Sequence, residues 1–142
     1  MKRFLNREFK LASRYKNDIS IIFFDIDEFK YVNDNFGHKV GDKILEEISF
    51  LISNNIREID HFGRWGGDEF LIILPQTNKT DATNVVNHIQ RKIKYHDFKI
   101  DNLETITCSF GTAEYEEGDT PDSLLKKADD EMYLNKKRRK RV

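Results

Sequence analysis

The chain has 142 residues, enough for one domain with a single core, and its 12% aromatic residues and distinct aliphatic runs exclude intrinsic disorder. The formal net charge is −1, and the one cysteine, Cys108, excludes an internal disulfide and a cysteine-based zinc site. No apolar segment is long enough for a signal peptide or a membrane span, so we predict a cytosolic protein.

The first part of the chain predicts a helix, a buried strand and two further helices. Residues 4–16 carry a loose helical stripe, and residues 19–24 form an almost unbroken apolar run, typical of a strand that is buried on both faces. A short helical piece follows around 29–32, then a loop with two glycines at 33–41. Apolar residues recur at helical spacing over 44–52, which predicts a long amphipathic helix.

The middle of the chain predicts a β-hairpin followed by a helix. Two apolar runs, 61–65 and 70–74, flank a pair of glycines and read as the two strands of the hairpin. Thr80 is a suitable N-cap for the next helix, whose apolar face lies within 85–93.

The last part of the chain predicts one strand and one helix. The strand is expected at about 104–110, where Cys108 would be a buried structural thiol. Thr120 and Pro121 then supply an N-cap and a first residue for the final helix. The order β-α-α-β-β-α-β-α, after the first helix, predicts an α+β domain in which helices cover a mostly antiparallel sheet.

Two acidic clusters lie at the ends of predicted strands. Asp25-Ile26-Asp27 ends the first buried strand, and Asp68-Glu69 lies at the tip of the hairpin. If the hairpin pairs beside the first strand, these carboxylates converge, and a hard metal ion would relieve their repulsion. The alternative for Gly-Gly-Asp-Glu alone is an ordinary turn with solvated acids. Two clusters at corresponding strand ends favour a Mg²⁺ site that acts on phosphate.

These motifs resemble a known family. The segment 64–70, Arg-Trp-Gly-Gly-Asp-Glu-Phe, resembles the signature of the GGDEF family of diguanylate cyclases. Similar blocks occur at 25–34, 36–42, 109–111 and 128–133, in the order and at the spacing of the family. The resemblance implies a GGDEF domain over residues 1–142, with a palm-like nucleotidyl-cyclase fold. It also implies an enzyme that condenses two GTP molecules into cyclic di-GMP and releases two pyrophosphates.

The resemblance assigns metal and catalytic roles to the two acidic clusters. Asp25, the backbone carbonyl of Ile26, Asp68 and Glu69 would hold two Mg²⁺ or Mn²⁺ ions. Asp68 and Glu69 would also be the catalytic pair. One of them would help to deprotonate the attacking 3′-hydroxyl, and Asp68 is preferred over Glu69 for this role.

Other positions of the motif are implied to bind the guanine and the backbone of GTP. Asn33 and Asp42 would read the guanine edge, because a carboxylate can accept both the N1–H and the N2 amino hydrogens, a donor pair that adenine lacks. Both also have structural alternatives, Asn33 as a turn residue and Asp42 as a first-turn acid. Gly66 and Gly67 leave the backbone bare for a phosphate. His38 matches a frequent family residue and is included among the implied substrate-binding residues, with a structural hydrogen bond as the expected role beside it.

The triphosphate is implied to bind at two places. One is the backbone amides of Phe29 and Lys30, and the other is the ammonium groups of Lys136 and Lys140. Taken alone, the basic run 136–141 is typical of a solvated helix end near the negative pole of the helix dipole. The resemblance favours phosphate contacts instead.

A second site lies upstream of the hairpin tip. Arg57 and Asp60 are spaced as in the Arg-x-x-Asp inhibitory site of the family, where Arg57 would fork onto the product and Asp60 would take its guanine edge. The alternative is a surface ion pair of little energetic value. We therefore expect cyclic di-GMP to be both product and inhibitor, and catalysis to require a homodimer.

The chain also departs from the family pattern. It begins where the segment ahead of the first family helix should be ending, so we expect a domain trimmed at its N-terminal edge. The regulatory or sensory domain would belong to a longer parent protein, either soluble or membrane-attached. Three other functions are alternatives: a GGDEF module that binds GTP or cyclic di-GMP without turnover, another purine cyclase, and a nucleic-acid-binding domain. Asp42 argues against adenine, and the net acidic remainder of the chain argues against nucleic acid.

Overall fold

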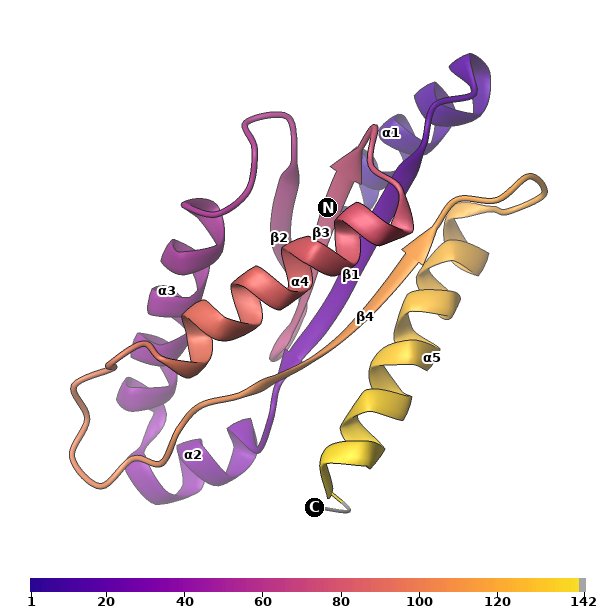
Figure 1. The fold of residues 1–142 in the computed structure, drawn as a ribbon. Helices are drawn as coiled ribbons and strands as arrows, with labels where there is room; N and C mark the ends of the chain where they lie inside the picture. Colours follow the sequence, from indigo (N-terminus) through magenta and orange to yellow (C-terminus); the bar gives the residue numbers. More distant parts are fainter. Residues whose placement is uncertain (141–142) are drawn as a thin grey trace.

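The computed structural model describes the backbone of residues 1–140 and the side chains of residues 1–138. In this part of the chain five helices and four strands form one α+β domain (Figure 1). The elements are α1 (Lys2–Tyr15), β1 (Ile19–Ile26), α2 (Phe29–Phe36), α3 (His38–Ser53), β2 (His61–Gly66), β3 (Glu69–Pro75), α4 (Lys79–Lys94), β4 (Cys108–Glu114) and α5 (Pro121–Lys140). None of the helices in residues 1–140 is long and apolar enough to cross a bilayer.

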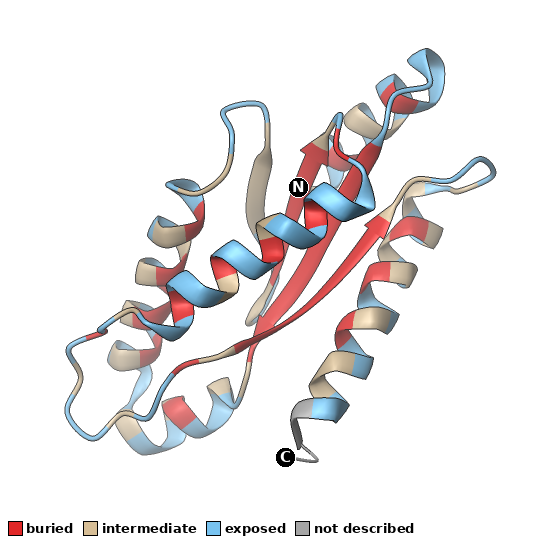
Figure 2. Ribbon diagram, in the orientation of Figure 1, coloured by how far each residue is buried: buried red, intermediate tan, exposed pale blue. Residues whose placement is uncertain are grey.

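The sheet has the strand order β2-β3-β1-β4, and each neighbouring pair is antiparallel. The predicted α+β fold with an antiparallel sheet is therefore confirmed. β1 and β3 are the two inner strands, and both are buried along most of their length (Figure 2). The prediction that the apolar run after residue 18 is an inner strand is confirmed as well.

Helices cover both faces of the sheet, which explains why β1 has no polar alternation. Ile22, Phe24 and Ile26 point to the face covered by α2, α3 and α4, while Ile21 and Phe23 point to the face covered by α1 and α5. Full burial of each such side chain contributes roughly 1.5–3 kcal/mol to stability. The two cores hold β1 in place from both sides, and with it the acidic residues at its end.

Helix α5 lies unusually close to β4. A Cβ atom at Gly111 would overlap the carbonyl oxygen of Ala128 and the backbone nitrogen of Met132. A glycine here lets the helix backbone rest directly on the strand. This close approach fixes α5 over the sheet and so determines where its later residue Lys136 can reach.

The predicted loop at 33–41 is wrong. Residues up to Phe36 belong to α2, and α3 begins at His38. Gly37 alone separates the two helices, with a φ of 89° that favours glycine, and its amide donates to the Asn33 carbonyl at 2.9 Å. The second glycine, Gly41, is buried inside α3, where it serves close packing instead of a turn.

Two boundaries in the second half also differ from the prediction. The N-cap of α4 is Asn78, whose Oδ1 accepts from the Asp81 amide at 2.8 Å, and Thr80 is already helical. The strand expected at 104–110 begins only at Cys108 and runs to Glu114. The buried state of Cys108 is confirmed.

Two other predicted elements match the structure closely. Thr120 caps α5 as expected, because its Oγ1 accepts from the Ser123 amide at 3.1 Å. The hairpin of β2 and β3 is also confirmed.

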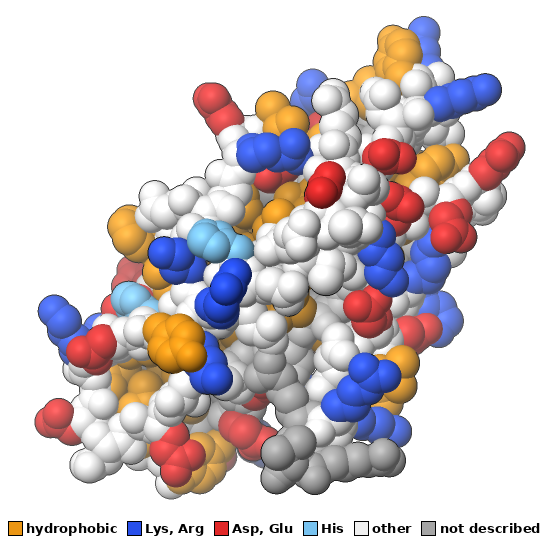
Figure 3. Space-filling model, in the orientation of Figure 1, with side chains coloured by type: hydrophobic (Ala, Val, Ile, Leu, Met, Phe, Trp, Pro, Cys, Tyr) orange, Lys and Arg blue, Asp and Glu red, His pale blue; other side chains and the backbone are white. Residues whose placement is uncertain are grey.

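On the face drawn in Figure 3, basic and acidic side chains are intermixed, as is usual for solvent-exposed helix surfaces.

Candidate active site

Strand pairing brings the two acidic clusters together. In the register of β1 and β3, Asp25 lies directly opposite Glu69, and Asp68 precedes Glu69 at the hairpin tip. The expectation that the hairpin pairs beside the first strand is therefore correct. The carboxylates of Asp25, Asp68 and Glu69 gather at one end of the two inner strands.

The hairpin tip is held in a defined conformation. Gly67 has a φ of 52°, in the left-handed region, and its carbonyl accepts from Arg64 Nε at 2.6 Å. The register of β2 and β3 shifts between Arg64 and Gly66, which marks a β-bulge. A Cβ atom at Gly66 or Gly67 would meet open space, so a ligand can approach the backbone on this side.

Asp25 is a buried acid, and one of its carboxylate oxygens has no hydrogen-bond partner among the described residues. Its side chain is 8% exposed, and its Oδ2 accepts from Lys136 Nζ at 2.9 Å. Its Oδ1 is buried without a hydrogen-bond partner among the described residues. Burial raises the pKa of Asp25, the contact with Lys136 lowers it, and the charges of Asp68 and Asp27 raise it further, so that the net shift is upward.

Glu69 experiences the same repulsion. Burial raises its pKa, and the negative charges of Asp129, Asp25 and Asp68 raise it further. A positive charge bound among these groups would lower their mutual repulsion. The two upward shifts therefore share two causes, burial first and then a local excess of negative charge.

This donor set fits a divalent cation. The leftover Oδ1 of Asp25 is a hard oxygen ligand beside Asp68 and Glu69. No three His, Cys, Asp or Glu side chains of the described residues already form a closed metal-binding group. An incomplete protein set is typical of Mg²⁺ sites, which use one or two carboxylates together with water and substrate phosphates.

Asp27 does not belong to this group, although the sequence placed it in the same cluster. Its Oδ2 accepts from Thr107 Oγ1 at 2.7 Å and its Oδ1 from Ser109 Oγ at 2.6 Å. Its amide donates to the Thr107 carbonyl at 2.9 Å. Asp27 thus fastens the end of β1 to the segment that leads into β4. Sequence reasoning missed Thr107, because a hydroxyl in an apolar run carries no distinct signal.

A pocket of about 430 Å³ lies between α3 and the hairpin. Asp42 lines it, together with apolar side chains that include Leu45 and the aromatic rings of Phe62 and Phe70. Asp42 lies in the second turn of α3, since the first turn contains no acid. The first-turn explanation of Asp42 is therefore wrong, and its carboxylate is available to the pocket.

Asn33 lies on α2 at the junction with α3. A Cβ atom at Gly41 would overlap Asn33 Oδ1 and would lie 3.3 Å from Phe29 Cζ. The Asn33 amide group thus rests against the bare backbone of α3, one residue before Asp42. His38, the first residue of α3, is exposed, and none of the hydrogen bonds found among the described residues supports the structural role expected for it.

Two residues separate the N-terminus of α2 from the end of β1. Glu28 precedes the helix with a φ of 56°, and no side chain caps it. The first backbone bond of the helix runs from the Val32 amide to the Glu28 carbonyl. The amides of Phe29 and Lys30 therefore have no partner within the helix, which is the arrangement that binds phosphate at helix N-termini.

The other predicted phosphate ligands lie on α5. Lys136 reaches Asp25, 111 residues away in the sequence, and this contact raises the pKa of Lys136. The side chain of Lys140 lies outside the described residues.

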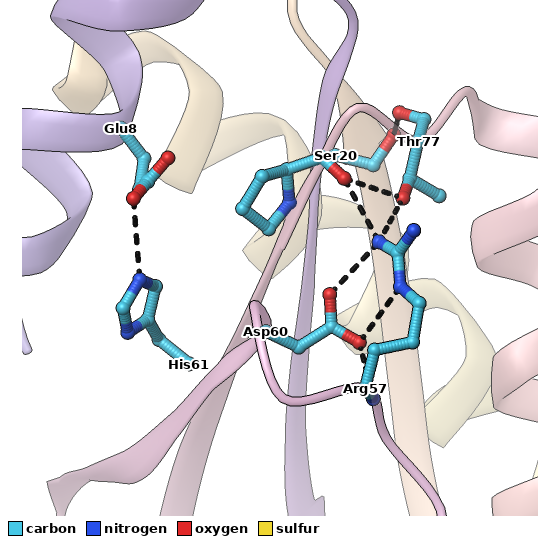
Figure 4. A network of polar contacts seen from close by, with 7 residues as sticks. Glu8, Ser20, Arg57, Asp60, His61 and Thr77 are labelled. Carbon is cyan, nitrogen blue, oxygen red and sulfur yellow. Dashed lines mark hydrogen bonds and ion pairs between the residues drawn. The ribbon is translucent and has the colours of Figure 1, made fainter.

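Arg57 and Asp60 form a compact network on the opposite end of the sheet (Figure 4). Arg57 Nη2 donates to Asp60 Oδ1 at 2.9 Å, and Arg57 Nε donates to Asp60 Oδ2 at 3.3 Å. Close by, His61 Nε2 lies 3.2 Å from Glu8 Oε1, which ties β2 to α1. The predicted pair is thus assembled, but its two members already bind each other.

Comparison with known proteins agrees with this architecture. The family model "Diguanylate cyclase, GGDEF domain" matches residues 1–141. The response regulator PleD of Caulobacter vibrioides is 37% identical over 131 residues, 89% of this chain and 29% of PleD. The diguanylate cyclase DosC of Escherichia coli is 33% identical over 143 residues, 96% of this chain and 31% of DosC. The chain spans less than a third of the length of these two relatives.

A solved structure supports the same assignment. The GGDEF domain of DgcB from Caulobacter crescentus, in complex with c-di-GMP, superposes with a TM-score of 0.90 at 26% identity. The match covers 96% of this chain and 82% of that one. The sequence motifs, the strand order and these comparisons lead to one conclusion: this chain belongs to the GGDEF domain family of diguanylate cyclases.

Proposed function

We propose that this domain condenses two GTP molecules into cyclic di-GMP and releases two pyrophosphates. The observation that carries the proposal is the opposition of Asp25 and Glu69 across β1 and β3, with Asp68 beside them and one buried oxygen of Asp25 unpartnered. Such a cluster lowers the stability of the free fold, and a bound cation with its phosphate would relieve it. The names of DosC and DgcB support the same chemistry.

The acidic end of the sheet would hold the metal. Asp25, the carbonyl of Ile26, Asp68 and Glu69 would bind two Mg²⁺ or Mn²⁺ ions. When bound, these ions neutralise phosphate charge and lower the pKa of the attacking 3′-hydroxyl. Asp68, on the accessible tip of the hairpin, would accept the proton of that hydroxyl, and Glu69 would remain with Asp25 in the strand pair.

Positive groups on two elements would bind the triphosphate. The free amides of Phe29 and Lys30 at the start of α2 donate to phosphate oxygens. Lys136 is held beside Asp25 and would exchange this carboxylate for a phosphate when the site fills. Because Lys136 is anchored at the site before substrate arrives, little of its orientation must change. Lys140 is a further phosphate ligand in this proposal.

The pocket between α3 and the hairpin would bind the base. Asp42 would accept the N1–H and N2 amino hydrogens of guanine, and the rings of Phe62 and Phe70 give the pocket an apolar wall. Asn33 would contribute its amide from the adjacent helix. Adenine has no matching pair of donors for Asp42, so GTP is the expected purine nucleotide.

Two chains would be needed for turnover. The cyclic product contains two phosphodiester bonds, and each domain offers one set of acidic, phosphate and base-binding groups. Two domains related by a two-fold axis would bring each 3′-hydroxyl to the α-phosphate of the other GTP. The Arg57–Asp60 site would then bind cyclic di-GMP and inhibit further synthesis.

The deciding experiment incubates the protein with GTP and Mg²⁺ or Mn²⁺ and separates the nucleotides. We expect cyclic di-GMP and pyrophosphate from the parent and neither from Asp68→Asn. Asp101→Asn, an exposed loop acid, is the matched control and should keep the parent rate. GTP binding without any cyclic product would instead identify a GTP-binding module, and a different product would contradict the proposed reaction.

A further inference from the structure

Arg57 reaches across to the loop that follows β3. Besides Asp60, its Nη2 group donates to the Pro75 carbonyl at 2.8 Å and to Thr77 Oγ1 at 2.7 Å. Three acceptors therefore share the two hydrogens of this nitrogen. The contacts join the loop before β2 to the loop before α4, as Figure 4 shows.

Thr77 is oriented to accept from Arg57. Its hydroxyl donates its own proton to the Pro75 carbonyl at 2.9 Å, which leaves the lone pairs of Oγ1 for the guanidinium. The Ser20 hydroxyl donates to the Thr77 carbonyl at 2.8 Å, and the side chain of Thr77 is buried. Gln76, with a φ of 52°, turns the chain at this point.

These contacts cover Asp60. The Asp60 side chain is 3% exposed, and its Oδ2 accepts from both Nε and the backbone amide of Arg57. A guanine edge needs an accessible carboxylate to receive its two N–H groups. The observed arrangement leaves no such access, so Arg57 must move before a guanine can reach Asp60.

We propose that Thr77 is a positioning residue of the Arg57–Asp60 site, whose hydroxyl holds Arg57 over Asp60 in the closed state. This inference rests on the proposed function, which assigns cyclic di-GMP to these two residues. A ligand that binds only the open state has its apparent affinity reduced by the fraction of molecules that are open. The Thr77–Arg57 hydrogen bond thus sets the product concentration at which inhibition begins.

The test measures the Kd of cyclic di-GMP by isothermal titration calorimetry for variants of residue 77. Thr77→Val keeps the shape of the side chain and removes the hydroxyl. Because Nη2 keeps its two other acceptors, loss of this one hydrogen bond should tighten binding by about threefold to tenfold. Thr77→Ser restores the hydroxyl and should return the Kd to that of the parent. An unchanged or weaker affinity in Thr77→Val would overturn the proposal.

Ser20→Ala is the matched control in the same network. It removes the bond to the Thr77 carbonyl and leaves every acceptor of Arg57 in place. Its Kd should stay close to that of the parent. If Ser20→Ala tightens binding as much as Thr77→Val does, general loosening of the loop accounts for the effect and the proposal fails.

Arg57→Ala separates this inference from the proposed function. If Arg57→Ala leaves the Kd unchanged, the product site itself is wrong, and the inference falls with it. If Arg57→Ala weakens binding while Thr77→Val matches the parent, the product site stands and the inference alone is overturned.

Discussion

Asp25 and Glu69 lie directly opposite each other in the antiparallel pair of β1 and β3. Like charges at such positions destabilise a sheet, and the pKa of each carboxyl is raised by burial and by the neighbouring acids. Only Lys136 of α5 is seen to offset this charge by direct contact with Asp25 among the described residues. The free fold therefore carries an electrostatic cost at the point where the proposed reaction takes place.

Removal of one of these charges should stabilise the free protein and impair the reaction. In Glu69→Gln we expect the free energy of unfolding in EDTA at neutral pH to rise by about 0.5–1 kcal/mol. The rate of cyclic di-GMP synthesis should fall by roughly a hundredfold or more, since a metal ligand is lost. Urea unfolding and nucleotide separation measure the two effects. A variant that is both less stable and fully active would contradict the proposed site.

The stability gain in Glu69→Gln should depend on pH. Since the pKa of Glu69 is raised on folding, the folded state holds the proton more tightly than the unfolded state. The cost of its charge is thus present above the folded pKa and disappears below the unfolded pKa. We expect the advantage of the variant to vanish below about pH 4. An equal advantage at both pH values would point to packing instead of charge.

Lys136 should stabilise the free site and bind the triphosphate. Lys136→Ala leaves the buried carboxylate of Asp25 without its ammonium partner, and we expect a loss of about 1 kcal/mol in EDTA, a modest value because Lys136 is 34% exposed. Added Mg²⁺ should recover more stability in this variant than in the parent. Thermal unfolding with and without Mg²⁺ measures this difference.

A control on the same helix is Lys126→Ala, because the ion pair of Lys126 and Asp130 is exposed to solvent. Lys126→Ala should change the thermal unfolding of the protein little, with or without Mg²⁺. The Lys136→Ala variant should also bind GTP more weakly than the parent does. Its affinity for guanosine, which has no phosphate, should equal that of the parent. Equal weakening toward both ligands would exclude a specific role at the phosphate.

Gly41 should matter for base selection through Asn33. Gly41→Ala favours the helix by about 1 kcal/mol but places a methyl group where the Asn33 amide lies. We expect several-fold weaker binding of GTP with little change for ATP. In an Asn33→Ala background the same substitution should have little further effect on GTP binding, because the group that clashes most severely is absent and only the 3.3 Å contact with Phe29 remains. Additive effects of the two substitutions on GTP binding would show that Gly41 does not act through Asn33.

Asp119 provides a second pH-dependent test, at the start of α5. Burial alone would raise its pKa, but hydrogen bonds from Lys127, the Glu116 amide and the Ser123 hydroxyl outweigh it, so that the pKa is lowered. Such a group stabilises the fold above its unfolded pKa, and this contribution is lost as the pH falls through the folded value. Asp119→Asn should therefore cost about 1 kcal/mol at neutral pH, with the difference shrinking below about pH 4. Urea unfolding of both proteins checks the trend, and a constant difference would contradict it.

Dependence on protein concentration tests the two-chain requirement. If the active site is shared between two domains, the specific activity should rise with protein concentration until the dimer is saturated. Sedimentation measured over the same range should show the dimer appearing in parallel. Flat specific activity over a wide dilution series would exclude a weak catalytic dimer.

Much of the fold was predictable from pattern alone, and the failures have local causes. The β1 run and the two hairpin strands were identified because burial on both faces removes polar alternation. The helix around Asn33 was missed because Gly37 and Gly41 look alike in sequence, although Gly37 breaks the helix and Gly41 packs inside one. Asn78 and Thr80 are both good caps, and the local sequence does not decide between them.

The acidic end of the site was predictable because strand pairing forces Asp25 toward Glu69. The closed state of the Arg57–Asp60 pair was not predictable from the sequence. It depends on the Pro75 carbonyl and on Thr77, which only the three-dimensional packing of two loops brings to Arg57. A backbone carbonyl is present at every residue, so a sequence motif does not show which carbonyl acts as an acceptor.

The contact between Asp25 and Lys136 joins residues that are 111 positions apart. During synthesis β1 therefore emerges long before the helix that carries its counter-charge, and a nascent chain that lacks α5 would have to bury Asp25 unpaired. Sheet formation and charge compensation are thus linked to the formation of α5. The proposed nucleotide chemistry should therefore appear only once α5 has been synthesised, since shorter chains lack both the ammonium group of Lys136 and the surface of α5 that packs on β4.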